Sequence, residues 1–170
     1  NAMKLALEHP KLVNRLIIYD SAGLYFPATF GPELFTPKDV AGVRRLLAML
    51  TPPPTPMPAF VARAALRKLQ RNAWVIRRSM VSMAGGHDLL DFRLNNMQPP
   101  TLIVWGAKDA LIPLSVGETM NRSIPRSTLG VVEGCGHLAP MECSKPVIEA
   151  TVNFLKAEPP VLGGERTYSR

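Results

Sequence analysis

Three short apolar runs, far apart in the chain, most constrain the fold. They are residues 12–19 ("LVNRLIIY"), 101–105 ("TLIVW") and 127–132 ("STLGVV"). Each run is bounded by Pro or Gly, and short, largely apolar runs of this kind are typical of strands buried on both faces of a parallel sheet. Helical spacing of apolar residues follows the second and third runs. This alternation of strand and helix predicts an α/β fold with about three parallel strands and flanking helices.

Sequence signals also predict where the two helices of the last third begin. Ser115 and Glu118 form the S-x-x-E pattern of a capping box, which predicts a helix start at Ser115. Pro146 suits the first turn of a closing helix, because proline lacks the N–H that this turn leaves unpaired. Apolar residues then follow on one helical face: Val147, Ile148, Val152 and Leu155.

The middle of the chain, residues 24–98, contains helical patterns but no strand-like run. Thr36 reads as an N-cap, with Pro37 at the first helical position and Asp39 in the first turn. A further helix is expected from Ala59 to about Met83, ended by two glycines. A helical insertion between two strands of one sheet is typical of a lid over a site, and an ordinary helical subdomain is the alternative.

Charge and composition exclude some classes of function. The net charge is +7, and many of the cations fall in the middle segment, where a solvated helix face is their expected role. No nucleic-acid partner is predicted, because no aromatic platform or known binding motif accompanies these cations. No apolar run reaches the ~20 residues that span a bilayer, so no transmembrane segment is expected. No secretory signal is visible, and a cytoplasmic location is expected.

The two cysteines, Cys135 and Cys143, predict neither a disulfide framework nor a metal site. Cys135 is expected to fill a tight loop and Cys143 to pack near the start of a helix. The sequence thus predicts no metal site, and no cofactor is expected.

One acidic residue and one histidine follow two successive predicted strands. Asp109 lies in "GAKDALIP" after the second run, and His137 lies in "GCGHLAPME" after the third. Functional groups gather beyond the carboxyl ends of parallel strands, and an Asp that holds a His in one tautomer supports a nucleophile relay. Alternatively, Asp109 could cap a turn or pair with Lys108, and His137 could be a buried, hydrogen-bonded loop residue. His9 and His87 lack such a context.

The segments "PPTLIVWGAKDALIPLSVGETM" and "VVEGCGHLAPMECSKPVIEATVNFL" resemble the C-terminal part of an α/β-hydrolase, and "LALEHPKLVNRLIIYDSAGL" resembles the helix after the nucleophile and the next strand. The stretch "SAGLY" is similar to the start of the cap in monoacylglycerol-lipase-like esterases. The resemblance implies a core of residues 1–23 and 99–157 and a helical cap of residues 24–98. The tail, residues 158–170, is linker-like by its composition.

The same resemblance assigns roles to the two loop residues. Asp109 would be the catalytic acid that orients His137, and His137 would be the general base. Asp20, at the end of the first strand, is an alternative acid because some members of the family place theirs there. The implied activity is hydrolysis of a small-molecule ester or acyl substrate by a Ser-Asp-His triad, without a cofactor or a metal.

The sequence departs from this family in one respect that matters for activity. It contains no G-x-S-x-G, the strand-to-helix turn that presents the nucleophile, and Ser21 and Ser115 lie in other contexts. We therefore expect a truncated hydrolase that is inactive alone, whose missing nucleophile is a Ser or an Asp. A homo-oligomer is expected, because the incomplete sheet would expose an edge. The alternative is a non-catalytic fragment that acts as a binding or self-assembly module.

Overall fold

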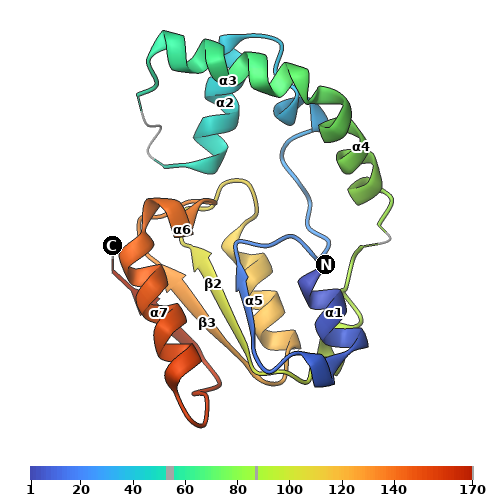
Figure 1. Ribbon diagram of the computed structural model, residues 1–170, viewed down its shortest axis with the longest axis vertical. Coiled ribbons are helices and arrows are strands. Elements are labelled where there is room, and N and C mark those ends of the chain that lie inside the picture. Colours follow the sequence, from blue (N-terminus) through green and yellow to red (C-terminus); the bar gives the residue numbers. More distant parts are fainter. Residues whose placement is uncertain (53–55, 87, 170) are drawn as a thin grey trace.

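A four-stranded parallel sheet forms the centre of the molecule (Figure 1). The computed structural model describes residues 1–52, 56–86 and 88–169, so His87, to which the sequence assigned no role, lies outside the described residues. The strands are β1 (Leu16–Tyr19), β2 (Thr101–Gly106), β3 (Ser127–Val132) and β4 (Glu165–Tyr168), in the spatial order β1-β2-β3-β4. The α/β expectation is confirmed, and every residue of β2 and β3 is buried, as their apolar runs predict.

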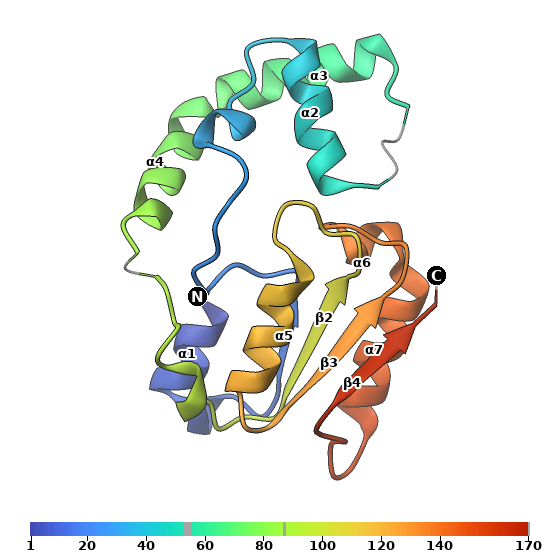
Figure 2. The same ribbon diagram turned by 180° about the vertical axis from the view of Figure 1, so that it is seen from behind.

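Helices cover both faces of the sheet, with α5 on one face and α7 on the other (Figures 1 and 2). The first layer contains α1 (Ala2–Glu8) and α5 (Leu114–Ser123), which pack on alternate side chains of β1, β2 and β3 such as Ile18, Ile103 and Leu129. The second layer contains α6 (Ala139–Glu142) and α7 (Ser144–Lys156), whose apolar side chains pack on Leu102, Val104 and Val132. The sheet is therefore buried on both sides, which is the arrangement that parallel strands require.

The chain leaves the sheet after β1 and returns to it at β2 through a long helical segment. This segment contains the short 3-10 turns η2 (Pro32–Phe35) and η3 (Leu94–Asn96), and the helices α2 (Val40–Leu50), α3 (Ala59–Arg71) and α4 (Ala73–Ala84). We call α2, α3 and α4 the helical insertion. It arches beyond the carboxyl ends of the strands (Figures 1 and 2).

The sequence placed several helix boundaries wrongly, each for a local reason. The insertion's first helix is capped by Asp39, not by Thr36, because the Asp39 carboxylate accepts a 2.7 Å hydrogen bond from the Gly42 N–H. The capping box at Ser115 is also wrong, since α5 begins one residue earlier, after Pro113. The helix expected from Ala59 to Met83 is two helices, because Asn72 breaks it in a turn conformation that asparagine favours.

The tail was expected to be a linker, and part of it is instead a strand. Gly163 and Gly164 both have positive φ, at 92° and 75°, and turn the chain back along the sheet. β4 then pairs with β3 in parallel register. Tyr168 packs over Gly130, where an added Cβ would lie only 3.0 Å from the tyrosine ring. Gly130, which weakens the third run as a strand in the sequence, leaves the room that this ring needs.

The two cysteines were expected to stay unpaired, and the structure contradicts this: Cys135 and Cys143 form a disulfide. The turn of α6 folds the chain back between them, so that their Cα atoms lie 6.3 Å apart and both side chains are buried. Disulfides are rare in the reducing cytoplasm, so the bond weighs against the expected location, which stays a prediction. Within the described residues, no helix has the length and apolar character that crossing a bilayer demands.

Candidate active site

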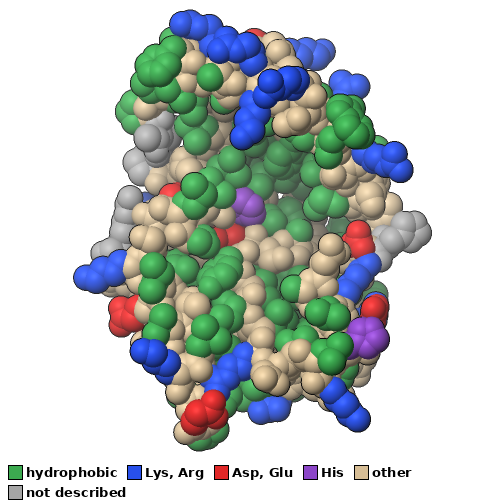
Figure 3. All heavy atoms as spheres, viewed as in Figure 1, with side chains coloured by type: hydrophobic (Ala, Val, Ile, Leu, Met, Phe, Trp, Pro, Cys, Tyr) green, Lys and Arg blue, Asp and Glu red, His purple; other side chains and the backbone are tan. Residues whose placement is uncertain are grey.

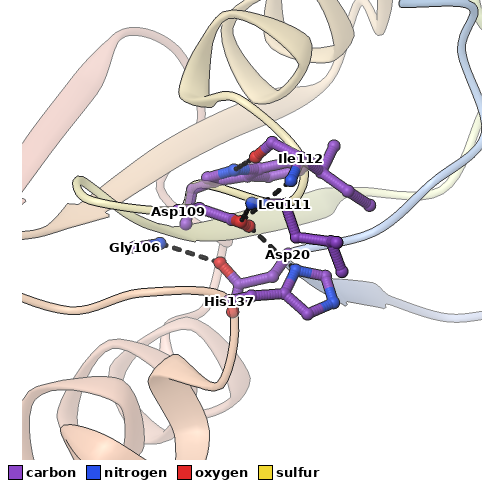
Figure 4. A network of polar contacts seen from close by, with 7 residues as sticks. Asp20, Gly106, Asp109, Leu111, Ile112 and His137 are labelled. Carbon is purple, nitrogen blue, oxygen red and sulfur yellow. Dashed lines mark hydrogen bonds and ion pairs between the residues drawn. The ribbon is translucent and has the colours of Figure 1, made fainter. Parts of the chain in front are cut away.

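The loops that follow β2 and β3 meet at the carboxyl edge of the sheet, and backbone hydrogen bonds join them. The Lys108 N–H donates to the Cys135 carbonyl at 2.8 Å. Gly106 lies so close to the second loop that an added Cβ would come within 2.2 Å of the Gly136 carbonyl oxygen. A side chain at position 106 would therefore push the loops apart. This contact holds Asp109 on one loop beside His137 on the other (Figure 4).

Asp109 is held in one orientation by the backbone of its own loop. One carboxylate oxygen, Oδ1, accepts hydrogen bonds from the N–H groups of Leu111 and Ile112, each at 2.9 Å. The other oxygen, Oδ2, lies 2.9 Å from Nδ1 of His137. The Asp109 side chain is fully buried, so its charge faces the imidazole through little water. The alternative of a surface pair with Lys108 is not found among the described residues, and Asp109 both caps its turn and binds the histidine.

This geometry sets the tautomer of His137. Because an ionised carboxylate only accepts hydrogen bonds, Nδ1 carries the proton and Nε2 keeps its lone pair. Burial of the imidazole lowers the pKa of His137, but the hydrogen bond to Asp109 and the charges of Asp109 and Asp20 raise it more, so that the pKa lies above its usual 6.5. The side chain retains 19% of its exposure, so a reactant can reach it. The pair can therefore accept a proton at Nε2 near neutral pH.

Asp20 lies beside this pair at the end of β1 and does not bind the imidazole. Its Oδ1 accepts a 2.8 Å hydrogen bond from the Gly106 N–H, and no partner of Oδ2 is found within the described part of the chain. Asp20 is 4% exposed and has a positive φ of 41°, which is uncommon for a residue with a side chain. Burial raises its pKa to about 7, the Gly106 N–H opposes this, and the nearby Asp109 adds to it.

The sequence named Asp20 only as an alternative acid for His137. The structure instead brings Asp109 to Nδ1, and Asp20 is a third ionisable group close enough to interact electrostatically with both residues. The position of Asp20 in the sequence is the signal that could have predicted its place in the site. A polar residue ends an apolar strand that pairs directly with β2, so its side chain reaches the same edge of the sheet.

The helical insertion reaches the site through the end of α2. An added Cβ at Gly136 would lie 2.3 Å from Pro52 and 2.7 Å from the Leu50 carbonyl oxygen, so this chain segment rests directly on the His137 loop. The space-filling view is hollowed between the insertion and the sheet, and hydrophobic side chains line the back of the hollow (Figure 3). The arrangement leaves a hollow between the insertion and the sheet (Figure 3).

Other residues considered in the sequence lie apart from this pair. Ser21 donates its hydroxyl to the Ala22 carbonyl, and Ser115 is exposed on α5. His9 is exposed where α1 ends. Within the described ranges, no three His, Cys, Asp or Glu side chains are grouped so that they could hold a metal ion. The site thus offers a proton acceptor, His137 Nε2, on an imidazole that the Asp109 carboxylate orients through Nδ1.

Comparisons with known proteins agree with this architecture. The family model described as "alpha/beta hydrolase fold" matches residues 52–143, more than half of the chain. A 2-hydroxymuconate semialdehyde hydrolase of Pseudomonas putida is 30% identical over 163 residues, which cover 91% of this chain and 58% of that protein. A second P. putida protein, 2-hydroxy-6-oxononadienedioate/2-hydroxy-6-oxononatrienedioate hydrolase 2, is 26% identical and covered over 59% of its length.

Solved structures share the arrangement in space. A serine hydrolase involved in carbazole degradation superposes with a TM-score of 0.67 at 25% identity, over 90% of this chain and 58% of that one. A bacterial membrane phospholipase A has a TM-score of 0.78 at 21% identity, over 91% of this chain and 52% of that one, a likeness of fold alone. The chain thus spans between half and three fifths of the length of the proteins named here.

Proposed function

This chain belongs to the α/β-hydrolase fold family, and from that premise we propose that His137 and Asp109 are the base and the orienting acid of a hydrolase. The bond that it cleaves is a carboxylic ester or a similar carbonyl bond in a small molecule. The observation that carries the proposal is the 2.9 Å hydrogen bond between His137 Nδ1 and a fully buried Asp109, with Nε2 left to accept a proton. The named relatives are themselves hydrolases, which supports the reaction class.

The proposed mechanism follows from the tautomer. A serine hydroxyl loses its proton to His137 Nε2 as its oxygen attacks the carbonyl carbon, and the proton then passes to the leaving group. A water molecule next loses a proton to Nε2 and attacks the acyl-enzyme, which releases the acid and restores the hydroxyl. Throughout, the Asp109 carboxylate stabilises the positive charge that forms on the imidazole.

The nucleophile itself is not evident in these 170 residues, which contain no G-x-S-x-G. We therefore expect this chain alone to show no His137-dependent turnover. An Asp in place of the serine would form an alkyl ester with substrate and would be typical of a dehalogenase or an epoxide hydrolase. The proposal requires no metal and no cofactor.

The helical insertion supports the assignment of separate core and cap domains to this chain. We assign residues 1–23 and 99–157 to the catalytic core and residues 24–98 to a cap that closes the site from above. The contact of Leu50 and Pro52 with the His137 loop supports the cap role, and the hydrophobic hollow supports an apolar acyl group (Figure 3). Half-buried apolar side chains such as Met49 and Leu50 lie on the side of α2 that packs toward the core.

The experiment that tests the proposal begins with the gene. The bases upstream of the region that encodes this chain are read, and an in-frame stretch encoding G-x-S-x-G is expressed together with this chain. Hydrolysis of nitrophenyl esters should then require both His137 and Asp109, and His137→Ala should lower kcat by several orders of magnitude. An upstream region without a nucleophile motif, or an ester turnover that His137→Ala leaves unchanged, would contradict the proposal.

A second candidate is a self-assembly module, and the position of β1 favours it. β1 is at the edge of the sheet and pairs only with β2 within the described ranges, so its other side can accept a further strand. A second copy that pairs there would give a homo-oligomer. Light scattering should then report a mass of at least twice 18.6 kDa, and a stable monomer at high concentration would exclude this candidate.

A further inference from the structure

The outer face of α3 and α4 carries large apolar side chains that contact no core. Phe60, Trp74 and Val81 are 68%, 70% and 74% exposed. The inner faces of the same helices hold the buried or half-buried residues: Ala62, Leu66, Leu69, Ile76 and Met80. The inner faces of α3 and α4 thus pack against the rest of the chain, and this packing sets the orientation of both helices. Burial in this chain explains the inner apolar residues and leaves the outer ones without an explanation.

Arginines occupy the positions between these apolar residues. The exposed residues form a stripe in two stretches, one on α3 and one on α4, which the break at Asn72 separates. Within each stretch the spacings are three and four residues, and residues so spaced are neighbours on a helix surface. We call the two stretches together the outer stripe, and its members are Phe60, Arg63, Arg67, Arg71, Trp74, Arg78 and Val81. Lysine and arginine are gathered over this end of the molecule (Figure 3).

Acids are scarce along the outer stripe: Asp88 shares a surface pocket with Trp74 and Arg78 at one end of it. The sequence has no Asp or Glu between Asp39 and Asp88. Within the described residues, none of the four arginines of the outer stripe takes part in an ion pair. A helix that merely faces water more often alternates acids with its bases, which support one another at i and i+4. On α3 and α4 themselves every charged residue is basic.

We propose that the outer stripe docks on a membrane surface that contains anionic lipid. Such a surface is complementary to both kinds of side chain at once. Arginines pair with lipid phosphates and carboxylates, while tryptophan, phenylalanine and valine enter the boundary between headgroups and acyl chains. A nucleic acid would pair with the arginines but would leave Val81 exposed to water.

The position of the outer stripe fits this role. α3 lies at the end of the molecule opposite the far ends of the sheet and α7 (Figures 1 and 2). α3 therefore meets a flat surface first, while α4 slopes back along the side of the molecule and the carboxyl ends of the strands stay away from that surface (Figures 1 and 2). This inference is independent of the proposed hydrolysis, since it requires only the surface of α3 and α4.

Two tryptophans make the test direct, because only one of them lies in the outer stripe. Trp74 is exposed, and Trp105 is fully buried in the core. Vesicles of phosphatidylcholine with a minority of phosphatidylserine should shift the Trp74 emission to shorter wavelength, and brominated acyl chains should quench it. Trp74→Phe should abolish both signals while the protein still sediments with the vesicles. Vesicles of phosphatidylcholine alone should give no shift.

Charge reversal at two stripe positions tests the electrostatic part. Arg67→Glu with Arg71→Glu should weaken sedimentation with phosphatidylserine vesicles by at least about 25-fold, because each cation at such a surface contributes about fivefold. The control is Arg126→Glu with Arg166→Glu, two exposed arginines outside the insertion that give the same net charge. If the first pair loses its circular dichroism spectrum, Arg67→Gln with Arg71→Gln replaces it.

Three results would overturn the proposal. The first is absence of binding to phosphatidylserine vesicles at low salt. The second is an equal loss of binding in the control pair, which would assign the effect to net charge and not to the outer stripe. The third is tight, salt-sensitive binding of single-stranded RNA by a protein that brominated lipid does not quench, which would make a nucleic acid the partner.

Discussion

Replacing Asp20 with asparagine should remove a pH dependence from the stability of the fold. The asparagine keeps an oxygen that can accept the Gly106 N–H and removes only the ionisation. The wild-type carboxyl has a pKa of about 7 in the fold and 3.8 when exposed. Between these values the folded chain holds a proton that the unfolded chain has released. The contribution of Asp20 is therefore fully present below pH 3.8 and is lost as the pH rises through about 7.

The size of the effect follows from the pKa difference. At 1.36 kcal/mol for each pKa unit, the shift from 3.8 to about 7 corresponds to a loss of about 4 kcal/mol in the free energy of unfolding. The part of this loss that falls between pH 5 and pH 8 is about 2.5–3 kcal/mol. The free energy of unfolding of wild type minus that of Asp20→Asn should fall by this amount across that range. His137 adds a slope of the same sign, because its raised pKa stabilises the fold below 6.5 and this stabilisation is lost as the pH rises through the folded value. Asp20→Asn reduces that slope, because the charge of Asp20 helps to raise the pKa of His137, and this reduction changes the difference between the two proteins in the same direction.

The assay is urea unfolding at several pH values, followed by the fluorescence of the buried Trp105. Asp91→Asn is the matched control, since it makes the same chemical change at an exposed aspartate that also accepts a backbone hydrogen bond, from Tyr25. Curves for wild type and Asp20→Asn that run parallel from pH 5 to pH 8 would refute the reasoning. They would mean that Asp20 is ionised in the fold throughout this range.

Further changes test how the site is supported. Gly106→Ala should lower the free energy of unfolding by about 2–3 kcal/mol, because the new Cβ would lie 2.6 Å from the Cys135 carbonyl oxygen; an unchanged Tm would contradict the contact. Cys135→Ala with Cys143→Ala should cost about 2–3 kcal/mol, the value for a short disulfide loop, and should make Tm insensitive to reductant; an equal loss on reduction in both proteins would show that the bond is absent. Arg15→Ala should cost about 2 kcal/mol by chemical denaturation, since Arg15 binds the Phe154 carbonyl at the end of α7; a change below about 0.5 kcal/mol would show a solvated arginine.

The elements that the sequence predicted well are those whose local pattern and final environment agree. β2 and β3 are largely apolar runs, and their environment is buried on both faces. The Asp109–His137 contact was foreseeable because residues that end neighbouring parallel strands meet at one edge. Their catalytic roles stay a proposal, as do the boundaries of the cap.

The elements that the sequence missed depend on partners far along the chain. β4 reads as a polar tail because only its pairing with β3 and the contact of Tyr168 with Gly130 make it a strand. The Cys135–Cys143 bond requires α6 to fold the chain back, which spacing alone does not reveal. The burial of Asp20 depends on β2 and on the His137 loop together, so that no local pattern predicts its raised pKa.

The central claim is that Asp109 and His137 act as one proton acceptor, and a nuclear magnetic resonance titration of the His137 ring nitrogens tests it most directly. In the wild type we expect a proton on Nδ1 at high pH, a free lone pair on Nε2 and a pKa above 6.5. Asp109→Asn should lower that pKa, because it removes the charge and the hydrogen bond that raise it. A pKa that is the same in both proteins, or a neutral imidazole with its proton on Nε2, would contradict the account.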